Sequence, residues 1–217
     1  MVTISPAKLA GNSLIWGPVI TVICYFYQQT VIYADVEWGN AASWAVAAAG
    51  GGAAMVIMSM IIPLALMVLV YGFFFIANEI RAGGNGAALV GYAMPMLLIA
   101  ITGWALAAGI TITVTNFPDP AAAAAAAMLA ANGINGIAGL FFSIGAAALF
   151  FAMASRAEYN STLANAAGLI ALLAAVLTII GTVSTGLNQM MTQIVGMTYI
   201  IHTIYSIYIG RGILARG

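Results

Sequence analysis

Long apolar stretches, separated by short segments that hold the charged residues, constrain the fold of this chain more than any other feature of its sequence. Several stretches exceed the roughly 18 residues that indicate a membrane-spanning helix. The 217 residues include five Lys or Arg and five Asp or Glu, whereas about a quarter of the residues of a soluble domain are charged. Ten charges cannot cover a soluble globule of this size. The sequence therefore predicts an all-α, polytopic integral membrane protein.

Charged residues, Pro and Gly divide the chain into about six spans within a single transmembrane domain, residues 1–217. The expected spans are residues 13–33, 53–76, 88–114, 121–154, 163–183 and 190–209. Residues 41–49 are a candidate interfacial helix, and the Gly triplet at 50–52 offers a kink or a start point before the second span. The fourth span is either one helix of about 51 Å or two pieces broken near residues 132–136.

With six spans, all basic residues fall on one side of the membrane, and three acidic residues fall on the other. The basic residues are Lys8, Arg81, Arg156, Arg211 and Arg216, and the acidic residues are Asp35, Glu37 and Asp119. Basic residues gather on cytoplasmic loops, so the N- and C-termini are both expected to be cytoplasmic. Asp35 and Glu37 form an outer acidic loop, for which a solvated loop is favoured over the rim of a cation vestibule.

The sixth expected span is the most polar one. Tyr199, His202, Thr203 and Ser206 recur at short steps that place them along one helix face. Polar groups are costly in lipid, so this face should contact protein or water, as should Asn132 and Asn135 of the fourth span. Hydrogen bonding between helices is the favoured interpretation of these residues. The alternatives are a pore lining, a ligand contact and, for His202, a single haem or metal ligand.

Small residues form a second pattern, on the fourth span. Gly136, Gly139, Ser143 and Ala147 follow one another at steps of three and four residues, which gives this span one continuous small face. Small residues allow membrane helices to approach closely. Packing inside the bundle is the favoured interpretation, and an interface with another subunit is the alternative.

The residue inventory argues against several chemistries. His202 is the only His and Cys24 the only Cys, so a bis-His haem and a Cys-based metal centre within the chain are excluded. No catalytic residues, no metal site and no cofactor are predicted, and the protein is not expected to be an enzyme. Without a basic patch, nucleic acid is not an expected partner, whereas bound lipid is.

Two functional hypotheses remain. The favoured one is a non-catalytic integral subunit of a larger membrane assembly of the respiratory, monooxygenase or secretion type, held to other subunits through small-residue helix faces. The alternative is a homo-oligomeric channel or facilitator for a small solute, assembled from copies of this chain and lined by the polar face of the sixth span together with Asn132 and Asn135.

Overall fold

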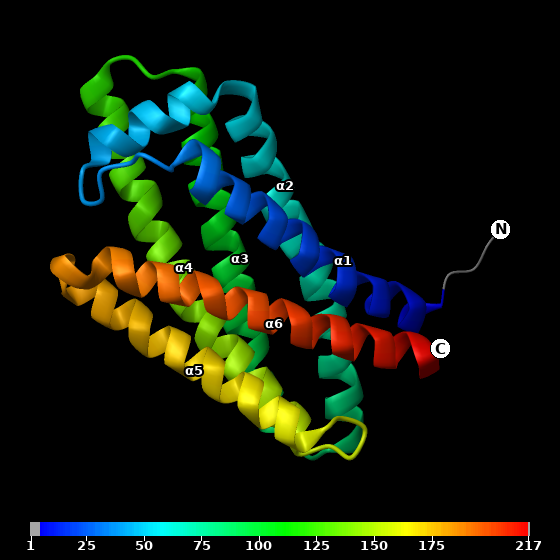
Figure 1. Cartoon of the computed structure of the whole chain (residues 1–217). Helices are drawn as coiled ribbons and strands as arrows, with labels where there is room; N and C mark the ends of the chain where they lie inside the picture. The colour runs from blue at the N-terminus through cyan, green and yellow to red at the C-terminus, as the bar shows by residue number, and fades with distance from the viewer. Residues whose placement is uncertain (1–4, 217) are drawn as a thin grey trace.

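A computed structural model describes residues 5–216, except for the side chain of Thr185, and these residues are almost entirely helical (Figure 1). The helices are α1 (Pro6–Tyr27), the π-helical turn η1 (Gln28–Ile32), α2 (Ala41–Gly83), α3 (Ala87–Asn116), α4 (Ala121–Ala154), α5 (Ser161–Val183), the 3-10 turn η2 (Thr185–Leu187) and α6 (Asn188–Arg216). The all-helical prediction is confirmed. In lipid a helix satisfies its own backbone hydrogen bonds, which is why apolar runs of this length form helices.

Five helical segments are long and apolar enough to cross a membrane: Pro6–Ile32, Ala41–Gly83, Ala87–Asn116, Ala121–Ala154 and Ser161–Val183. These segments indicate a membrane protein. The sixth helix, α6, has 29 residues and therefore sufficient length, but it is less apolar than the other five because of its polar face. A sixth crossing of the membrane by α6 stays a prediction, and so does the side on which the termini lie.

The first helix changes its winding at its C-terminal end. After Tyr27 the chain continues as the π-helical turn η1, which extends the apolar segment to Ile32. A π-turn inserts an extra residue into the helical repeat, and such turns occur frequently at functional sites. In this protein the turn carries the adjacent amides of Gln28 and Gln29.

The second helix consists of two arms that meet at Gly52. This residue has φ 50° and ψ −132°, which is far from helical and favours glycine. The short arm, residues 41–51, lies across one end of the molecule, and the long arm descends through the bundle (Figure 1). The Gly triplet thus acts as a break between a short terminal helix and a long helix.

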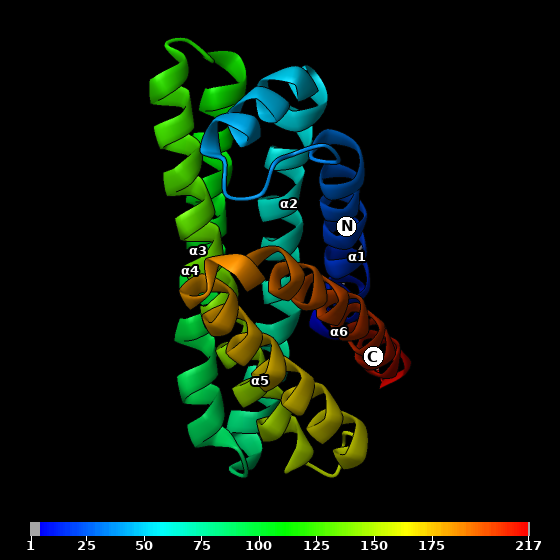
Figure 2. The same ribbon diagram turned by 60° about the vertical axis from the view of Figure 1, so that its left-hand side comes forward.

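Successive helices form three antiparallel pairs. Contacts join α1 to α2, α3 to α4, and α5 to α6, and α4 lies at the centre because it also contacts α2 and α5. The tip of the α3–α4 hairpin extends beyond the tip of the α5–α6 hairpin (Figure 2). The main core lies between α2, α3 and α4, with Phe150, Leu149, Ile76 and Leu97 fully buried.

Glycines bring α1 very close to two neighbours. A Cβ on Gly17 would lie 2.7 Å from the backbone nitrogen of Leu69 on α2. On the other side of α1, a Cβ on Gly210 of α6 would lie 2.7 Å from the carbonyl oxygen of Gly11. Without a Cβ at these positions the backbones meet directly, as small residues allow in membrane helices.

The fourth helix has no interruption. α4 is helical through all 34 residues from Ala121 to Ala154, including residues 132–136. The broken alternative for this span is therefore wrong. Gly133 and Gly136 have no atoms close to a hypothetical Cβ, so neither is needed for a close approach or a bend. Two isolated glycines weaken a helix by about 1 kcal/mol each, which the packing of α4 against three neighbours offsets.

Gly52→Ala should destabilise the protein by about 1–3 kcal/mol, because Ala must adopt a backbone conformation that L-residues rarely occupy. No atom lies within 4 Å of a Cβ at this position, so the effect comes from the backbone alone. Gly50→Ala is the matched control, since Gly50 also has open space around its Cβ position but no positive φ. Unfolding in mixed micelles measures both variants. Equal stability of the two would contradict the assigned break.

Candidate functional site

A cavity of about 780 Å³ lies between the helices of the bundle and is partly open to the outside, because lining residues such as Leu129, Ile137 and Asn135 are exposed. Side chains from all six long helices and from η1 line it. Among the described residues, its lining includes no Asp, Glu, Lys or Arg. A cavity of this volume is within the range of about 300–1,000 Å³ that small-molecule sites occupy.

One end of the cavity, which we call the amide end, is rich in primary amides. Its members come from η1, from α4 and from the start of α6: Gln28, Gln29, Asn132, Asn135, Asn188 and Gln189. Gln28 is buried and donates from Nε2 to Ser59 Oγ at 3.5 Å. Asn188 donates from Nδ2 to the carbonyl oxygen of Gly181 at 3.0 Å. Each amide offers both a donor group and an acceptor group.

The other end, which we call the histidine end, is more apolar. It is lined by His202 and Ser206 of α6 together with Pro18, Phe73 and Phe150. Asn188 and His202 are 14 residues apart on α6, so the two ends are separated by about 21 Å along the helix axis. Ser206 Oγ donates to the carbonyl oxygen of Leu14 on α1 at 2.6 Å, which ties α6 to α1 beside the cavity.

His202 is a buried residue at the edge of the cavity, and its two ring nitrogens are themselves closed off from the cavity. Its side chain is 7% exposed, and neither Nδ1 nor Nε2 makes a hydrogen bond. The ring lies 5.7 Å from that of Phe150, centroid to centroid, at an angle of 45°. A buried polar group without a partner costs about 1–3 kcal/mol. The ring faces the backbone carbonyl of Ala167 on α5, so the interhelical hydrogen bond that the sequence suggests for His202 stays a prediction.

Aromatic rings form the wall between the two ends. Tyr199 lies edge-on to three rings, with centroid distances of 6.3 Å to Tyr25, 6.4 Å to Trp104 and 6.1 Å to Phe142. Trp104 and Phe142 also contact each other at 5.2 Å. These rings come from α1, α3, α4 and α6. Their edge contacts with one another make this part of the lining rigid and mainly apolar.

The structure brings all six residues of the expected polar face to this cavity: Asn132, Asn135, Tyr199, His202, Thr203 and Ser206. Their functional role stays a prediction. Sequence reasoning did not include the two glutamines of η1, the amides at the start of α6 or the aromatic wall. A polar residue that interrupts an apolar span is the signal that these amides share, whereas the aromatic residues resemble ordinary packing in the sequence.

The small-residue face of α4 points into the chain. Gly139, Ser143 and Ala147 are buried, and Ser143 Oγ donates to the carbonyl oxygen of Gly139 at 2.8 Å. Gly136 is half-buried, and both Gly136 and Gly139 line the cavity. A Cβ on Gly139 would lie 3.5 Å from the Tyr199 hydroxyl. This face therefore contributes to the interior of one chain.

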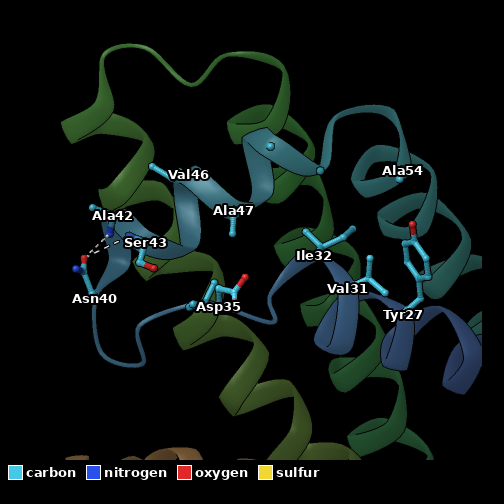
Figure 3. A pocket seen from close by; sticks show the side chains of 13 residues that line it. Tyr27, Val31, Ile32, Asp35, Asn40, Ala42, Ser43, Val46, Ala47 and Ala54 are labelled. Carbon is cyan, nitrogen blue, oxygen red and sulfur yellow. Dashed lines mark hydrogen bonds between the residues drawn. The ribbon is translucent and has the colours of Figure 1, made fainter.

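The loop that carries Asp35 and Glu37 lies beside a second pocket, of about 690 Å³, between η1 and the short arm of α2. Asp35 lines this pocket below Ala47 (Figure 3). Glu37 lies outside the lining of both pockets, and its carboxylate accepts a hydrogen bond of 2.8 Å from Asn40 Nδ2. Neither acidic residue therefore lines the main cavity, although their neighbours Tyr33 and Trp38 do.

At the opposite end of the molecule, one carboxylate joins three segments. Glu79 Oε2, at the end of α2, accepts a hydrogen bond of 2.8 Å from the hydroxyl of Tyr159 in the α4–α5 loop. The same oxygen lies 3.4 Å from the guanidinium of Arg216 at the end of α6. The Arg216 guanidinium also lies over the Tyr159 ring, at 5.8 Å from its centroid. We call these three residues the Glu79 cluster.

Two pKa values in this loop reflect its contacts. The hydrogen bond from Arg156 holds the pKa of the Glu158 carboxyl below its usual range. Burial, and then the hydrogen bond to Glu79, raise the pKa of the Tyr159 hydroxyl above its usual range. The stability that the protonated Tyr159 hydroxyl contributes is present below the unfolded-state tyrosine pKa of about 10, and it is lost as the pH rises beyond that value.

Within residues 5–216, no three His, Cys, Asp or Glu side chains are grouped closely enough to hold a metal ion.

Comparison of the chain with protein-family models, with curated proteins and with solved structures gives no match. The function must therefore be argued from the cavity and its chemistry.

Tyr159→Phe removes one hydroxyl from the Glu79 cluster and should lower the free energy of unfolding by about 1–2 kcal/mol at neutral pH. The variant should also lose less stability than the wild type above about pH 10, because the raised pKa of Tyr159 is gone. Melting temperatures across a pH series measure both effects. Tyr92→Phe, at an exposed tyrosine of α3, is the control, and equal losses in both variants would rule out a stabilising role for the cluster.

Proposed function

We propose that this protein is a membrane facilitator that binds a small uncharged solute in the cavity and conducts it through the interior of a single chain. The observation that supports this function best is the lining of the cavity, which combines amides, hydroxyls and an imidazole with no charged residue among those described. In this proposal the pathway lies within one chain and does not require a ring of copies.

The uncharged lining favours a neutral solute because an ion in a membrane interior needs an opposite charge or a complete set of ligands. Amides and hydroxyls can replace the water molecules around a neutral polar solute, whereas the lipid tails cannot. The free energy that the solute loses on leaving water is thereby offset by hydrogen bonds inside the protein. An ion-coupled mechanism has no support, since the ionisable groups with charge at neutral pH lie outside the cavity lining.

The outward face of α6 agrees with a protein that contacts lipid on this side. Its exposed residues are apolar over most of the helix: Met190, Ile194, Met197, Ile201, Ile204 and Tyr208. Most polar residues of α6 line the cavity, whereas Gln193 is exposed outside that lining. α6 therefore leaves few polar groups that a covering subunit would have to hide.

Asn135→Ala should slow the flux of an uncharged solute into proteoliposomes by about tenfold, which corresponds to about 1.4 kcal/mol of lost interaction. Asn165→Ala is the matched control, because Asn165 is also an exposed helical amide but does not line the cavity. Light scattering after mixing with acetamide or glycerol measures the flux. If neither variant changes it, or if wild-type protein gives no flux above empty liposomes, the proposal fails.

The non-catalytic subunit hypothesis makes a different prediction. Under the facilitator proposal, native mass spectrometry of protein gently extracted from its source membrane should detect this chain without other polypeptides at fixed stoichiometry. Other polypeptides at fixed stoichiometry would instead favour the subunit hypothesis, and their identity would indicate the function of the assembly.

A further inference from the structure

We infer that an anionic phospholipid binds where α1 begins and α6 ends, and that its phosphate group contacts Lys8 and Arg211. The two helix ends lie side by side (Figure 1). Three observations carry this inference: a surplus of positive charge at this end of the bundle, the placement of both cations on one exposed side of the α1–α6 contact, and the order of side chains along the outer faces of the two helices. It does not depend on the solute of the cavity.

The surplus of charge remains after the ion pairs at this end are counted. Each of its two acidic side chains already contacts an arginine, because Glu158 lies 2.6 Å from Arg156 and Glu79 lies 3.4 Å from Arg216. Three further basic residues lie at this end, near the start of α1 and the ends of α2 and α6: Lys8, Arg81 and Arg211. All three are exposed, and none makes an ion pair within residues 5–216. A membrane supplies anions at this surface in the form of acidic lipid headgroups.

Lys8 and Arg211 lie at nearly the same level of the bundle. The contact between their helices is marked by Gly11 and Gly210, because a Cβ on Gly210 would lie 2.7 Å from the Gly11 carbonyl oxygen. Lys8 precedes Gly11 by three residues, or about 4.5 Å along α1. Arg211 follows Gly210 directly, about 1.5 Å further along α6. Since the helices are antiparallel, both cations lie between this glycine contact and the end of the bundle.

Both cations also point to the same side of the contact. At 100° per residue, Lys8 is rotated from Gly11 by about 60°, and Arg211 is rotated from Gly210 by about 100° in the same sense along its own chain. On antiparallel helices, equal senses of rotation point to the same side. The opposite sense leads to Ala10 and Ile209, which are buried. The two cations therefore share the exposed side, where one phosphate group can reach both.

The side chains that follow along the outer faces match the parts of a phospholipid. Trp16, about 12 Å along α1 from Lys8, is 57% exposed, and Tyr208, one turn before Arg211 on α6, is 52% exposed. Such rings favour the boundary between headgroups and acyl chains. Further along α1 the exposed side chains are aliphatic, at Ile20 and Ile23. The order of cation, aromatic ring and aliphatic side chain thus parallels phosphate, glycerol and acyl chain.

An anionic lipid fits these cations better than a zwitterionic one. Phosphatidylcholine carries an ammonium group beside its phosphate, and two basic residues repel that group. Phosphatidylglycerol has the same phosphate without the positive charge. Each Lys or Arg close to an anionic lipid surface strengthens binding by about fivefold. A preference of at least about fivefold for phosphatidylglycerol is therefore expected at this site.

The first experiment measures this preference with lipids whose acyl chains carry bromine, which quenches nearby tryptophan fluorescence. The full-length protein is reconstituted into phosphatidylcholine bilayers that contain either brominated phosphatidylglycerol or brominated phosphatidylcholine. Subtracting the signal of Trp16→Phe isolates the fluorescence of Trp16. Phosphatidylglycerol should quench it with a relative binding constant at least about fivefold higher. Equal quenching by the two lipids would overturn the inference.

The second experiment assigns the preference to the two cations. Lys8→Gln combined with Arg211→Gln should bring the two lipids to about equal quenching of Trp16. Arg81→Gln is the matched control, because it removes the same charge from an exposed residue of α2, outside the α1–α6 contact. It should keep the preference. An unchanged preference in the double variant, or a loss in Arg81→Gln as large as in Lys8→Gln alone, would show a diffuse attraction and refute the site.

Inorganic phosphate separates a lipid site from a site for any phosphate. Added at constant ionic strength, it should leave the quenching by phosphatidylglycerol unchanged, because the lipid is also held by contacts of its acyl chains. Displacement of the lipid by phosphate would assign a simple anion site to Lys8 and Arg211, and the inference of a lipid site would fail.

Discussion

Polar side chains in a membrane must be hidden from the lipid tails, and the arrangement of this protein depends on that constraint. Each helix satisfies its own backbone, so the bundle is determined by where the remaining amides, hydroxyls and the single imidazole can lie. Many of them lie around one cavity, whereas others such as Asn165 and Gln193 are exposed, and Ile and Met residues dominate the outward face of α6. A less apolar helix can thus belong to a membrane bundle as long as its polar residues face inward.

Close contacts between helix backbones are the second feature on which the arrangement of the helices depends. Gly17 lets α1 approach α2, and Gly11 and Gly210 let α1 approach α6. Without them α1 would be held away from both neighbours, and the Ser206 hydroxyl would not reach Leu14 of α1. The histidine end of the cavity is therefore closed by backbone packing as well as by side chains.

Much of the helical layout follows from local sequence. The apolar runs predicted the helices, and the Gly triplet marked the position where α2 breaks, since Gly52 accepts a backbone conformation that other residues resist. The polar face of α6 was visible because Tyr199, His202 and Ser206 recur at helical spacing. The continuity of α4 was not visible in the sequence, because the weak helix propensity of residues 132–136 competes with tertiary packing. The placement of Gln28, Asn132 and Asn188 around one cavity depends on which helices are neighbours, and no local pattern encodes that.

The contact between α1 and α6 has a mechanical consequence. A Cβ on Gly11 would lie 2.6 Å from Leu214 Cγ, and a Cβ on Gly210 would lie 2.9 Å from Ile15 Cγ1, so side chains of each helix fill the space that a glycine of the other leaves. The short hydrogen bond from Ser206 and, at the end of α6, the Glu79 cluster hold the same register. Movement of α6 along α1 therefore requires packed side chains to change rotamer together with the polar contacts, which makes this seam a fixed part of the bundle.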